Sequence, residues 1–268
     1  MDGGFATKEE LIEKITKKKE FSELPEKDVE IAFERFDKKR NAEYQKIKLT
    51  RNFLRKIYSS FTSRKLLSLK EKDVEWFLLK HKSTKERMTY YKEIYSKIFR
   101  GINGKEISII DLGAGINGFS FEFFPKKFKI NYFGVEAIGQ LVKLVNNYFN
   151  TLKGTSKNKI KGKVFHFSLF EKTKVNNLIK ESKGVKIIFM FKVIDSLEVM
   201  QRNYSKELLL KIVPESDLTV LSFATRSLGK RKRFSAKRVW ILKFIEEEFK
   251  IVNDFEVGGE RYILFKKK

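Results

Sequence analysis

Short apolar segments recur along the second half of the chain, and this recurrence constrains the fold more than any other feature. Each segment has the length of a strand, and helical stretches separate the first five. The seven segments are 107–112, 132–135, 163–167, 185–191, 218–223, 250–255 and 261–265. Alternating strands and helices predict an α/β protein, with a mostly parallel sheet covered by helices on both faces. Gly258 and Gly259 separate the last two segments and predict a terminal β-hairpin.

The first hundred residues have a helical pattern instead. Apolar residues recur at helical spacing over 9–15, 28–36 and 45–61, and no strand-like alternation appears. A further helix is expected to begin at Ser83, because Ser83-Thr84-Lys85-Glu86 fits a capping box with Ser83 as the N-cap. We therefore expect two domains, an N-terminal helical domain over 1–100 and an α/β domain over 101–268.

The charge distribution indicates a polyanionic partner. The chain has 58 Lys and Arg against 34 Asp and Glu, a net charge of +24. Three stretches, 44–70, 137–170 and 218–245, contain no acidic residue. Ordinary solvated surface would account for scattered lysines but not for acid-free blocks. Binding to nucleic acid is the better interpretation.

The first and third acid-free stretches supply the residues that we expect to contact RNA, and the first of them makes 1–100 the expected RNA-docking domain. Lys48, Arg51 and Arg55 lie beside the apolar stripe of one predicted helix, where they would form a basic face for phosphates. Further candidates lie along the same stretch and after the fifth strand: Arg64, Lys230, Arg231 and Arg233.

Several classes of protein are disfavoured by what the sequence lacks. It contains no cysteine and only two histidines, His81 and His166, so neither a disulfide nor a multi-histidine metal site is expected. No apolar run approaches the roughly 18 residues of a membrane span, and the acidic N-terminus does not resemble a signal peptide. We expect a cytoplasmic protein that binds no metal and no membrane, with a monomer as the default state.

The turn after the first strand has the features of a nucleotide site. Gly113 and Gly115 permit a tight turn and close approach by a ligand, with a helix expected next, and Glu136 ends the second strand, where it could accept two ribose hydroxyls. Together with Gly118 the segment also fits the G-x-G-x-x-G pattern of dinucleotide sites. A pyrophosphate would be repelled by Asp111 inside the first strand, whereas an acid at this position is typical of methyltransferases, where it helps to hold the amino-acid end of the cofactor. S-adenosyl-L-methionine is therefore favoured over a dinucleotide cofactor.

Five motifs in a shared order resemble one family across most of the chain. They are His81–Arg87, Asp111–Asn117, Phe165–Glu171, Phe191-Lys192 and Ser222–Arg231. These segments are similar to the 16S rRNA (guanine-N7) methyltransferases of the ArmA and RmtB type, which are associated with aminoglycoside resistance. The resemblance implies the class I methyltransferase version of the Rossmann-like fold, with a seven-stranded sheet that ends in a hairpin, and the small ribosomal subunit as partner.

The resemblance also implies roles for individual residues. Arg87 would pair with the cofactor's carboxylate, Glu136 with its ribose and Glu171 with the adenine edge. Lys192 and Arg226 would bind target RNA or place the guanine, as the catalytic residues. The remaining residues expected in the cofactor site are Asp111, Gly113, Ala114, Gly115, Asn117, Ala137 and Phe191.

The sequence departs from the family pattern, and structural roles compete with the functional ones. Both cofactor acids are Glu where the family has Asp, and Gly118 and Ala224 replace prolines. Arg87 could instead be a surface ion-pair partner, and Glu171 could be an acid at a helix N-terminus. The two histidines are expected to be structural, His166 in packing and His81 at a helix entry.

The implied chemistry needs no general base, because guanine N7 carries a free lone pair and no proton. Catalysis would then depend on alignment of the reacting atoms, and a donor placed on N7 would block the nucleophile, so the cations should address O6 or phosphates. Phe119, Phe191 or Phe223 could stack on the extruded base. Methylation of another RNA or base position, and a non-catalytic ribosome-assembly role, stay open.

Overall fold

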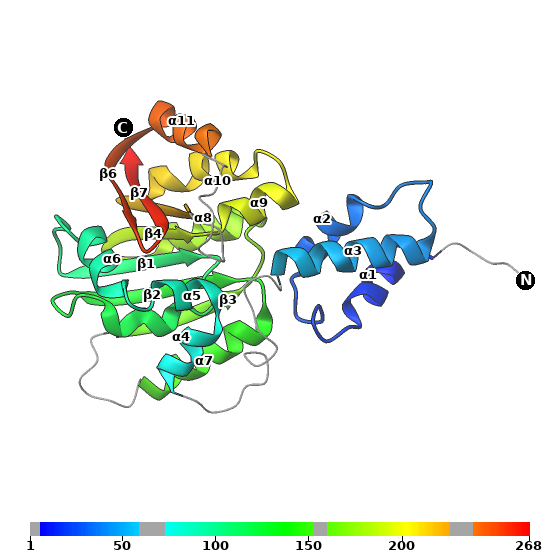
Figure 1. Ribbon diagram of the computed structural model, residues 1–268, viewed down its shortest axis with the longest axis horizontal. Coiled ribbons are helices and arrows are strands. Elements are labelled where there is room, and N and C mark those ends of the chain that lie inside the picture. The colour runs from blue at the N-terminus through cyan, green and yellow to red at the C-terminus, as the bar shows by residue number, and fades with distance from the viewer. Residues whose placement is uncertain (1–5, 59–72, 153–159, 226–237) are drawn as a thin grey trace, which may run out of the picture.

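The computed structural model describes residues 6–58, 73–152, 160–225 and 238–268. Three helices at the N-terminus form a small unit beside the rest of the molecule (Figure 1). They are α1 (Lys8–Thr16), α2 (Glu26–Glu34) and α3 (Glu43–Tyr58). Thr7 and Glu10 form a reciprocal capping box that starts α1. The unit has its own apolar core, which Met200 of the α/β part completes.

The rest of the chain is built on a seven-stranded sheet. Its strands are β1 (Glu106–Leu112), β2 (Lys129–Glu136), β3 (Ile160–His166), β4 (Val185–Phe191), β5 (Leu218–Ala224), β6 (Phe249–Val257) and β7 (Glu260–Lys267). The order is β3-β2-β1-β4-β5-β7-β6, with β1 to β5 parallel and β7 antiparallel to both neighbours. The predicted parallel sheet with a terminal hairpin is confirmed, and both hairpin glycines have positive φ.

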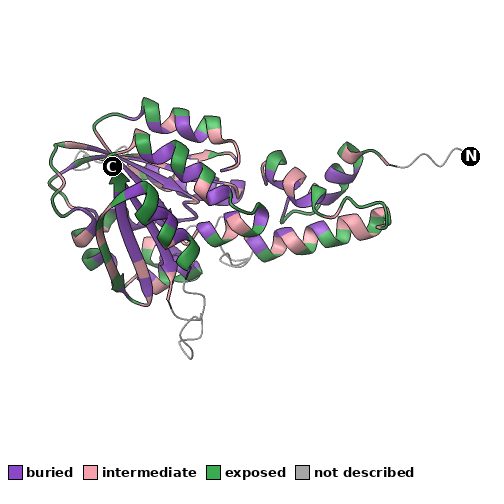
Figure 2. Ribbon diagram, turned by 90° about the horizontal axis from the view of Figure 1, so that it is seen from above, coloured by how far each residue is buried: buried purple, intermediate pink, exposed green. Residues whose placement is uncertain are grey.

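Helices cover both faces of the sheet, as Figure 2 shows by the burial of their sheet-facing sides. One layer contains α4 (Val74–Lys80), α5 (Lys82–Arg87), α6 (Tyr91–Ile98) and α7 (Gly139–Leu152). The other contains α8 (Lys172–Glu181), α9 (Ile194–Met200), α10 (Tyr204–Ile212) and α11 (Val239–Glu248). A 3₁₀ turn, η3 (Val213–Glu215), precedes β5.

The helix that precedes β1 in the sequence, α6, packs on the sheet and not on the N-terminal unit. Tyr91, Ile94, Tyr95 and Ile98 of α6 are buried in the same core as Phe189 of β4. We infer that a division by packing falls between α3 and α4, and not near Gly101 as the change of pattern predicted.

The segment after the glycine turn differs from the expected α-helix. It forms a 3₁₀ helix, η2 (Asn117–Phe123). Gly118 lowers its helix propensity, and Pro125 lies only two residues beyond its end, so little room remains for regular α-helical turns. The short element turns its aromatic residues into the core, and Phe119 stacks on Phe77 with 4.9 Å between ring centroids. Phe119 is therefore not available to stack on a target base.

Candidate cofactor pocket and its charged rim

A pocket opens where the carboxyl ends of β1, β2 and β4 meet the N-terminal helical unit. It encloses about 780 Å³, part of it open to solvent, and both parts of the molecule contribute to its wall. Gly113, Gly115, Glu136 and Lys192 come from the sheet side. Asp28, Ile57 and Tyr58 come from α2 and α3. In an open α/β sheet this edge is the usual place for a ligand.

The glycine loop and Glu136 form one hydrogen-bonded unit. Gly113 and Gly115 have φ of +75° and +53°, and a Cβ on Gly113 would lie 2.6 Å from Val193 Cγ2. The Gly115 amide donates to Glu136 Oε2 at 2.8 Å, and the Ile138 amide donates to Oε1 at 2.9 Å. Burial raises the pKa of Glu136, while these backbone donors oppose the rise. The carboxylate is thus held in place with lone pairs left for a ligand.

Asp111 supports this loop from beneath. Its Oδ2 accepts hydrogen bonds from Asn117 Nδ2 and from the Tyr132 hydroxyl, both at 2.8 Å. Tyr91 in turn donates to Asn117 Oδ1 at 3.2 Å. None of these four residues borders the pocket, and neither does the buried Ala114. The contacts of Asp111 and Asn117 orient the turn rather than reach into the cavity.

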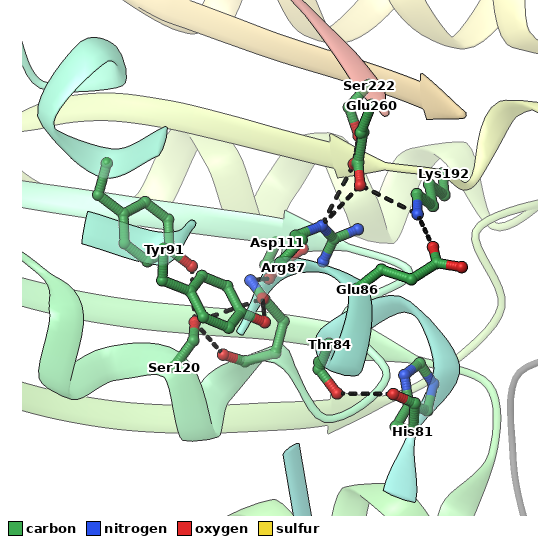
Figure 3. Close-up of polar contacts among 12 residues, drawn as sticks. His81, Thr84, Glu86, Arg87, Tyr91, Asp111, Ser120, Lys192, Ser222 and Glu260 are labelled. Atoms are coloured by element: carbon green, nitrogen blue, oxygen red, sulfur yellow. Dashed lines mark hydrogen bonds and ion pairs between the residues drawn. The ribbon is translucent and has the colours of Figure 1, made fainter. Parts of the chain in front are cut away.

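A charged cluster lies beside the pocket (Figure 3). Arg87 Nε is 3.1 Å from Glu260 Oε2, and Lys192 Nζ is 3.0 Å from the same oxygen. Lys192 Nζ also lies 2.5 Å from Glu86 Oε2, and the Ser222 hydroxyl donates to Glu260. Burial alone would raise the pKa of Glu260, but the Arg87 and Lys192 charges outweigh it and the pKa is lowered.

This cluster explains why the predicted capping box is wrong. The N-cap of α5 is His81 and not Ser83, and it makes no side-chain cap bond. The Glu86 carboxylate turns to Lys192 instead of to the helix start, because an ion pair with a nearly buried cation is stronger than a cap bond.

Lys192 has an unusual backbone. Its φ is +56°, in the left-handed region that a residue with a Cβ rarely adopts, and its amide donates to the Ser222 carbonyl at 3.0 Å. Residues held this way cluster at functional sites. The conformation turns the chain at the end of β4, and the Lys192 ammonium lies between Glu86 and Glu260. Lys192, predicted as a catalytic residue, and Phe191, predicted as a cofactor-binding residue, both border the pocket, and their roles there stay predictions.

Arg87 is buried, so its interpretation as a surface partner is wrong. Its guanidinium lies over the Phe191 ring, 4.9 Å from the centroid. Nη2 is buried and has no hydrogen-bond partner among the described residues. A buried donor without a partner costs free energy, on the order of 1–3 kcal/mol, that a carboxylate ligand would recover.

Both histidines make structural contacts, as expected. His81 borders the pocket and links α4 to α5. Burial, reinforced by the Arg87 and Lys192 charges, lowers the pKa of His81 to about 3. His166 ends β3, and its Nε2 lies 2.8 Å from the Glu23 carbonyl and 3.0 Å from the Ala137 carbonyl. It thereby joins the helical unit to the sheet.

Glu171 is close to the pocket but does not line it. It occupies the N-cap of α8, where Oε2 accepts the Ser168 amide at 3.1 Å and Oε1 pairs with Lys174 Nζ at 2.5 Å. Its neighbours Leu169 and Phe170 border the pocket instead. The alternative interpretation as an acid at a helix start fits this position, and a contact with the adenine edge stays a prediction.

The predicted basic face of α3 is largely tied within the protein. Arg51 donates to the carbonyls of Ile15 and Lys14, and Arg55 pairs with Glu20 at 2.5 Å. These contacts fasten α3 to α1 and to the turn after it. Four of the other predicted RNA-binding or catalytic residues follow β5 and one follows α3. These five residues, which lie outside the described ranges, are Arg226, Lys230, Arg231, Arg233 and Arg64.

Sequence reasoning missed two buried acids and one arginine. Glu260 begins β7 after the hairpin, and an acid at the start of so apolar a strand is a signal that was available. Asp28 was hidden within an ordinary amphipathic helix. Arg238 adopts φ of +43°, pairs with Asp195 at 2.6 Å and covers the Phe223 ring, so Phe223 is occupied within the fold.

The residues of the pocket fit an adenosyl cofactor. Glu136 is an acceptor for ribose hydroxyls, the positive-φ glycines permit close approach, and apolar side chains such as Phe170 and Met200 form the wall. In the described ranges, no group of three or more possible ligands is placed to hold a metal ion. No helix within those ranges is long and apolar enough to cross a membrane.

The fold and the site define a Rossmann-like protein of the class I methyltransferase type. A family model described as ribosomal RNA methyltransferase (FmrO) matches residues 52–241, and the chain belongs to this family. It is 26% identical over 192 residues to a 16S rRNA (guanine(1405)-N(7))-methyltransferase of Proteus mirabilis. That match covers 69% of this chain and 62% of the curated relative, so it spans less than two thirds of the relative's length.

Solved structures share the fold over almost the whole chain. The 16S rRNA methylase RmtB superposes with a TM-score of 0.75 at 18% identity, covering 97% of this chain and 98% of RmtB. The 16S rRNA methyltransferase RmtF, crystallised with S-adenosyl-L-homocysteine, gives 0.75 at 18% identity over 100% of both chains. The resemblance drawn from the sequence motifs is thereby confirmed at the level of family and fold.

Proposed function

We propose that this protein is an S-adenosyl-L-methionine-dependent methyltransferase that modifies N7 of a guanine in small-subunit 16S rRNA. The observation that carries the proposal is the pocket in which Glu136 and the glycine loop face a rim that holds Lys192. Membership of an rRNA methyltransferase family and the guanine-N7 activity named for the Proteus mirabilis relative support it. The partner is then the small ribosomal subunit, and the location is the cytoplasm.

Each part of the pocket has a role toward the cofactor, which supplies the methyl group. Glu136 accepts from the ribose hydroxyls, and the backbone of Gly113 and Gly115 lies against the ligand. Arg87 lies beside the pocket, and its Nη2, which has no hydrogen-bond partner among the described residues, is the donor for the cofactor's carboxylate. Asp111 and Asn117 hold the turn from beneath.

The transfer itself needs alignment rather than proton removal. Guanine N7 has a lone pair and no proton, and the histidine beside the pocket, His81, stays neutral because its pKa is about 3. Holding nucleophile and methyl group in line supplies the rate enhancement. Lys192 and Arg226 address O6 or a phosphate, since a donor on N7 would block the nucleophile.

RNA binding is assigned to the acid-free stretches. The candidates are Lys48, Arg51, Arg55, Arg64, Lys230, Arg231 and Arg233. Arg51 and Arg55 would contact RNA in addition to the contacts that hold α3 to α1 and to the turn after it. Two basic stretches far apart in the sequence suit a folded RNA better than a short oligonucleotide. An assembled 30S subunit is therefore the expected substrate rather than naked rRNA.

A methyl-transfer assay with labelled S-adenosyl-L-methionine tests the proposal. Purified 30S subunits and naked 16S rRNA are compared, and the labelled nucleotide is mapped. Label at an N7-methylguanine in the decoding site of the 30S sample is the expected result. Label at another nucleotide would favour the second candidate, a methyltransferase of another RNA position. Absence of both label and cofactor binding would favour a non-catalytic assembly factor.

Aminoglycoside resistance is the cellular outcome that the proposal predicts. Expression of the chain in a susceptible bacterium should raise the inhibitory concentration of aminoglycosides that bind the decoding site. The matched control is the same bacterium with a Lys192→Ala chain produced at the same level. Equal sensitivity of both strains to these aminoglycosides would indicate a housekeeping modification and not a resistance function.

A further inference from the structure

A second buried carboxylate borders the pocket, and it comes from the N-terminal helical unit. Asp28 of α2 is 2% exposed and lies in the wall that also contains Glu136. The Tyr58 hydroxyl of α3 donates to Asp28 Oδ1. Oδ2 is buried and meets no donor in hydrogen-bonding geometry within the described part of the chain. An acceptor in this state has a free-energy reason to bind a donor from a ligand.

The sheet order places Asp28 at one end of the pocket. Lys192 ends β4, Glu136 ends β2 and β3 is the edge strand beyond it. Leu169 and Phe170 follow β3 and border the pocket on that side. Asp28 belongs to the same side, because Lys27 of the same helix lines a hollow together with Phe167 and Glu171. With Glu136 at the ribose, the base of an adenosyl ligand lies toward β3, beside Asp28.

The wall around Asp28 is otherwise apolar. Ile57, Ile138 and Phe170 surround a space suited to a flat base. The other acid in this region, Glu171, is already engaged by the Ser168 amide and by Lys174. Burial raises the pKa of the Asp28 carboxyl. The Ser168 hydroxyl, which is near the carboxyl but makes no hydrogen bond to Oδ2, and the Tyr58 hydroxyl, which donates to Oδ1, oppose the rise. Among the described residues that border the pocket, Asp28 is the acidic side chain on the base side.

We propose that Asp28 is a specificity residue that accepts a hydrogen bond from the 6-amino group of the cofactor's adenine. This inference rests on the proposed function, since it assumes an adenosyl ligand with its ribose at Glu136. It gives the N-terminal helical unit a second task besides RNA docking. Docking of α2 and α3 against the sheet completes the cofactor pocket, so cofactor binding and the packing of this unit stabilise each other.

The test compares two ligands by isothermal titration calorimetry on the full chain. S-adenosylhomocysteine carries the 6-amino donor, whereas S-inosylhomocysteine carries a carbonyl oxygen at the same position. The unsubstituted protein should bind the adenosyl ligand at least about 10-fold more tightly, because sites built to pair with a polar group discriminate strongly against its loss. In Asp28→Asn, Oδ1 keeps the Tyr58 hydroxyl and the amide nitrogen faces the ligand. The preference should fall at least about 10-fold or reverse.

Matched variants separate the possible outcomes. Asp37→Asn makes the same chemical change at an exposed position of the helical unit, where Asp37 pairs with Lys46, and should leave the preference unchanged. Tyr58→Phe removes the donor that positions Asp28 while keeping the ring, and should weaken the preference even if Asp28→Asn does not fold. An unchanged preference in both variants, or a change in Glu171→Gln instead, would overturn the inference. Failure of the unsubstituted protein to bind S-adenosylhomocysteine would overturn the proposed function itself.

Discussion

Lys192 and Glu260 form an ion pair of 3.0 Å between the end of β4 and the start of β7, with Glu260 almost fully buried. Arg87 approaches the same carboxylate from α5, and Glu86 pairs with Lys192 from the other side (Figure 3). One acid therefore orients the two cations that the family resemblance assigns to cofactor and target. The geometry makes Glu260 a positioning residue that acts through Arg87 and Lys192.

Replacing Glu260 by Gln should leave two cations with too little negative charge around them. We expect a loss of about 3 kcal/mol in the free energy of unfolding, because breaking a buried ion pair leaves an uncompensated charge. Urea unfolding of the purified variant measures this. Glu256→Gln on the exposed side of the adjacent strand is the control and should change stability by less than about 0.5 kcal/mol.

The same variant carries a pH signature. The folded pKa of Glu260 is lowered, so its stabilising contribution is present above the unfolded pKa and is lost as the pH falls through the folded pKa. The difference in unfolding free energy between the unsubstituted protein and Glu260→Gln should be largest near neutrality and shrink in acid. A difference that stays constant down to the acid transition would show that the effect of the substitution is steric and not ionic.

Lys192 should be needed for methyl transfer more than for cofactor binding. Lys192→Ala should lower kcat by about 100-fold, the size of effect expected when a single preorganised polar group is lost. The affinity for S-adenosylhomocysteine should change far less, since Glu136 and the glycine loop remain. Single-turnover kinetics and calorimetry on the same preparation measure the two quantities. A loss of affinity as large as the loss of kcat would place Lys192 in cofactor binding instead.

The backbone conformation of Lys192 leads to a separate prediction, which concerns stability. Its φ of +56° costs a residue with a Cβ about 1 kcal/mol, and Ala bears the same cost as Lys. Lys192→Gly should therefore be more stable than Lys192→Ala by about 1 kcal/mol, although both lack the ammonium group. Thermal unfolding of the two variants side by side measures the difference. Equal stability would mean that the turn relaxes when the ion pairs are removed.

The sheet could be predicted from the sequence because each strand has a recognisable pattern in its own few residues. Each of the seven segments is short and apolar, and the paired glycines mark the hairpin, so neighbouring residues suffice. The ion-pair cluster could not be predicted in this way. Glu260 reaches Arg87 and Lys192 only because β7 pairs with β5 in a register that sets Glu260 opposite Ala224. Partners brought together by strand pairing leave no local pattern.

The pocket was predicted in part for the same reason. The glycine turn and Glu136 belong to one unit, β1–η2–β2, and their closeness follows from the parallel pairing of β1 and β2. Asp28 belongs to a helix of a separate packing unit, and its amphipathic pattern explained it fully as a helix residue. The prediction for Glu171 came from the family pattern. In the structure Glu171 is the residue before α8, and its carboxylate accepts the Ser168 amide.

Glu136 is expected to determine cofactor affinity. Glu136→Gln keeps one acceptor oxygen but removes the charge, and its amide must place a donor where the Gly115 or Ile138 amide already donates. We expect the dissociation constant of S-adenosylhomocysteine to rise about 10- to 100-fold, or about 1.4–2.7 kcal/mol. The exposed Glu122→Gln serves as the control and should bind as the unsubstituted protein does. Normal affinity in Glu136→Gln would move the ribose site elsewhere.

His81 should make the protein sensitive to mild acid without taking part in catalysis. Its folded pKa of about 3 is far below the 6.5 of an unfolded histidine, so between these values the unfolded chain binds more protons. Stability is fully present above pH 6.5 and falls as the pH drops, by up to about 1.4 kcal/mol per pH unit from this residue. His81→Gln should flatten this part of the curve in urea unfolding between pH 5 and 7, while the pH profile of kcat in that range should be unchanged. A break in kcat near pH 6.5 that disappears in His81→Gln would instead make His81 an acid–base group of the reaction.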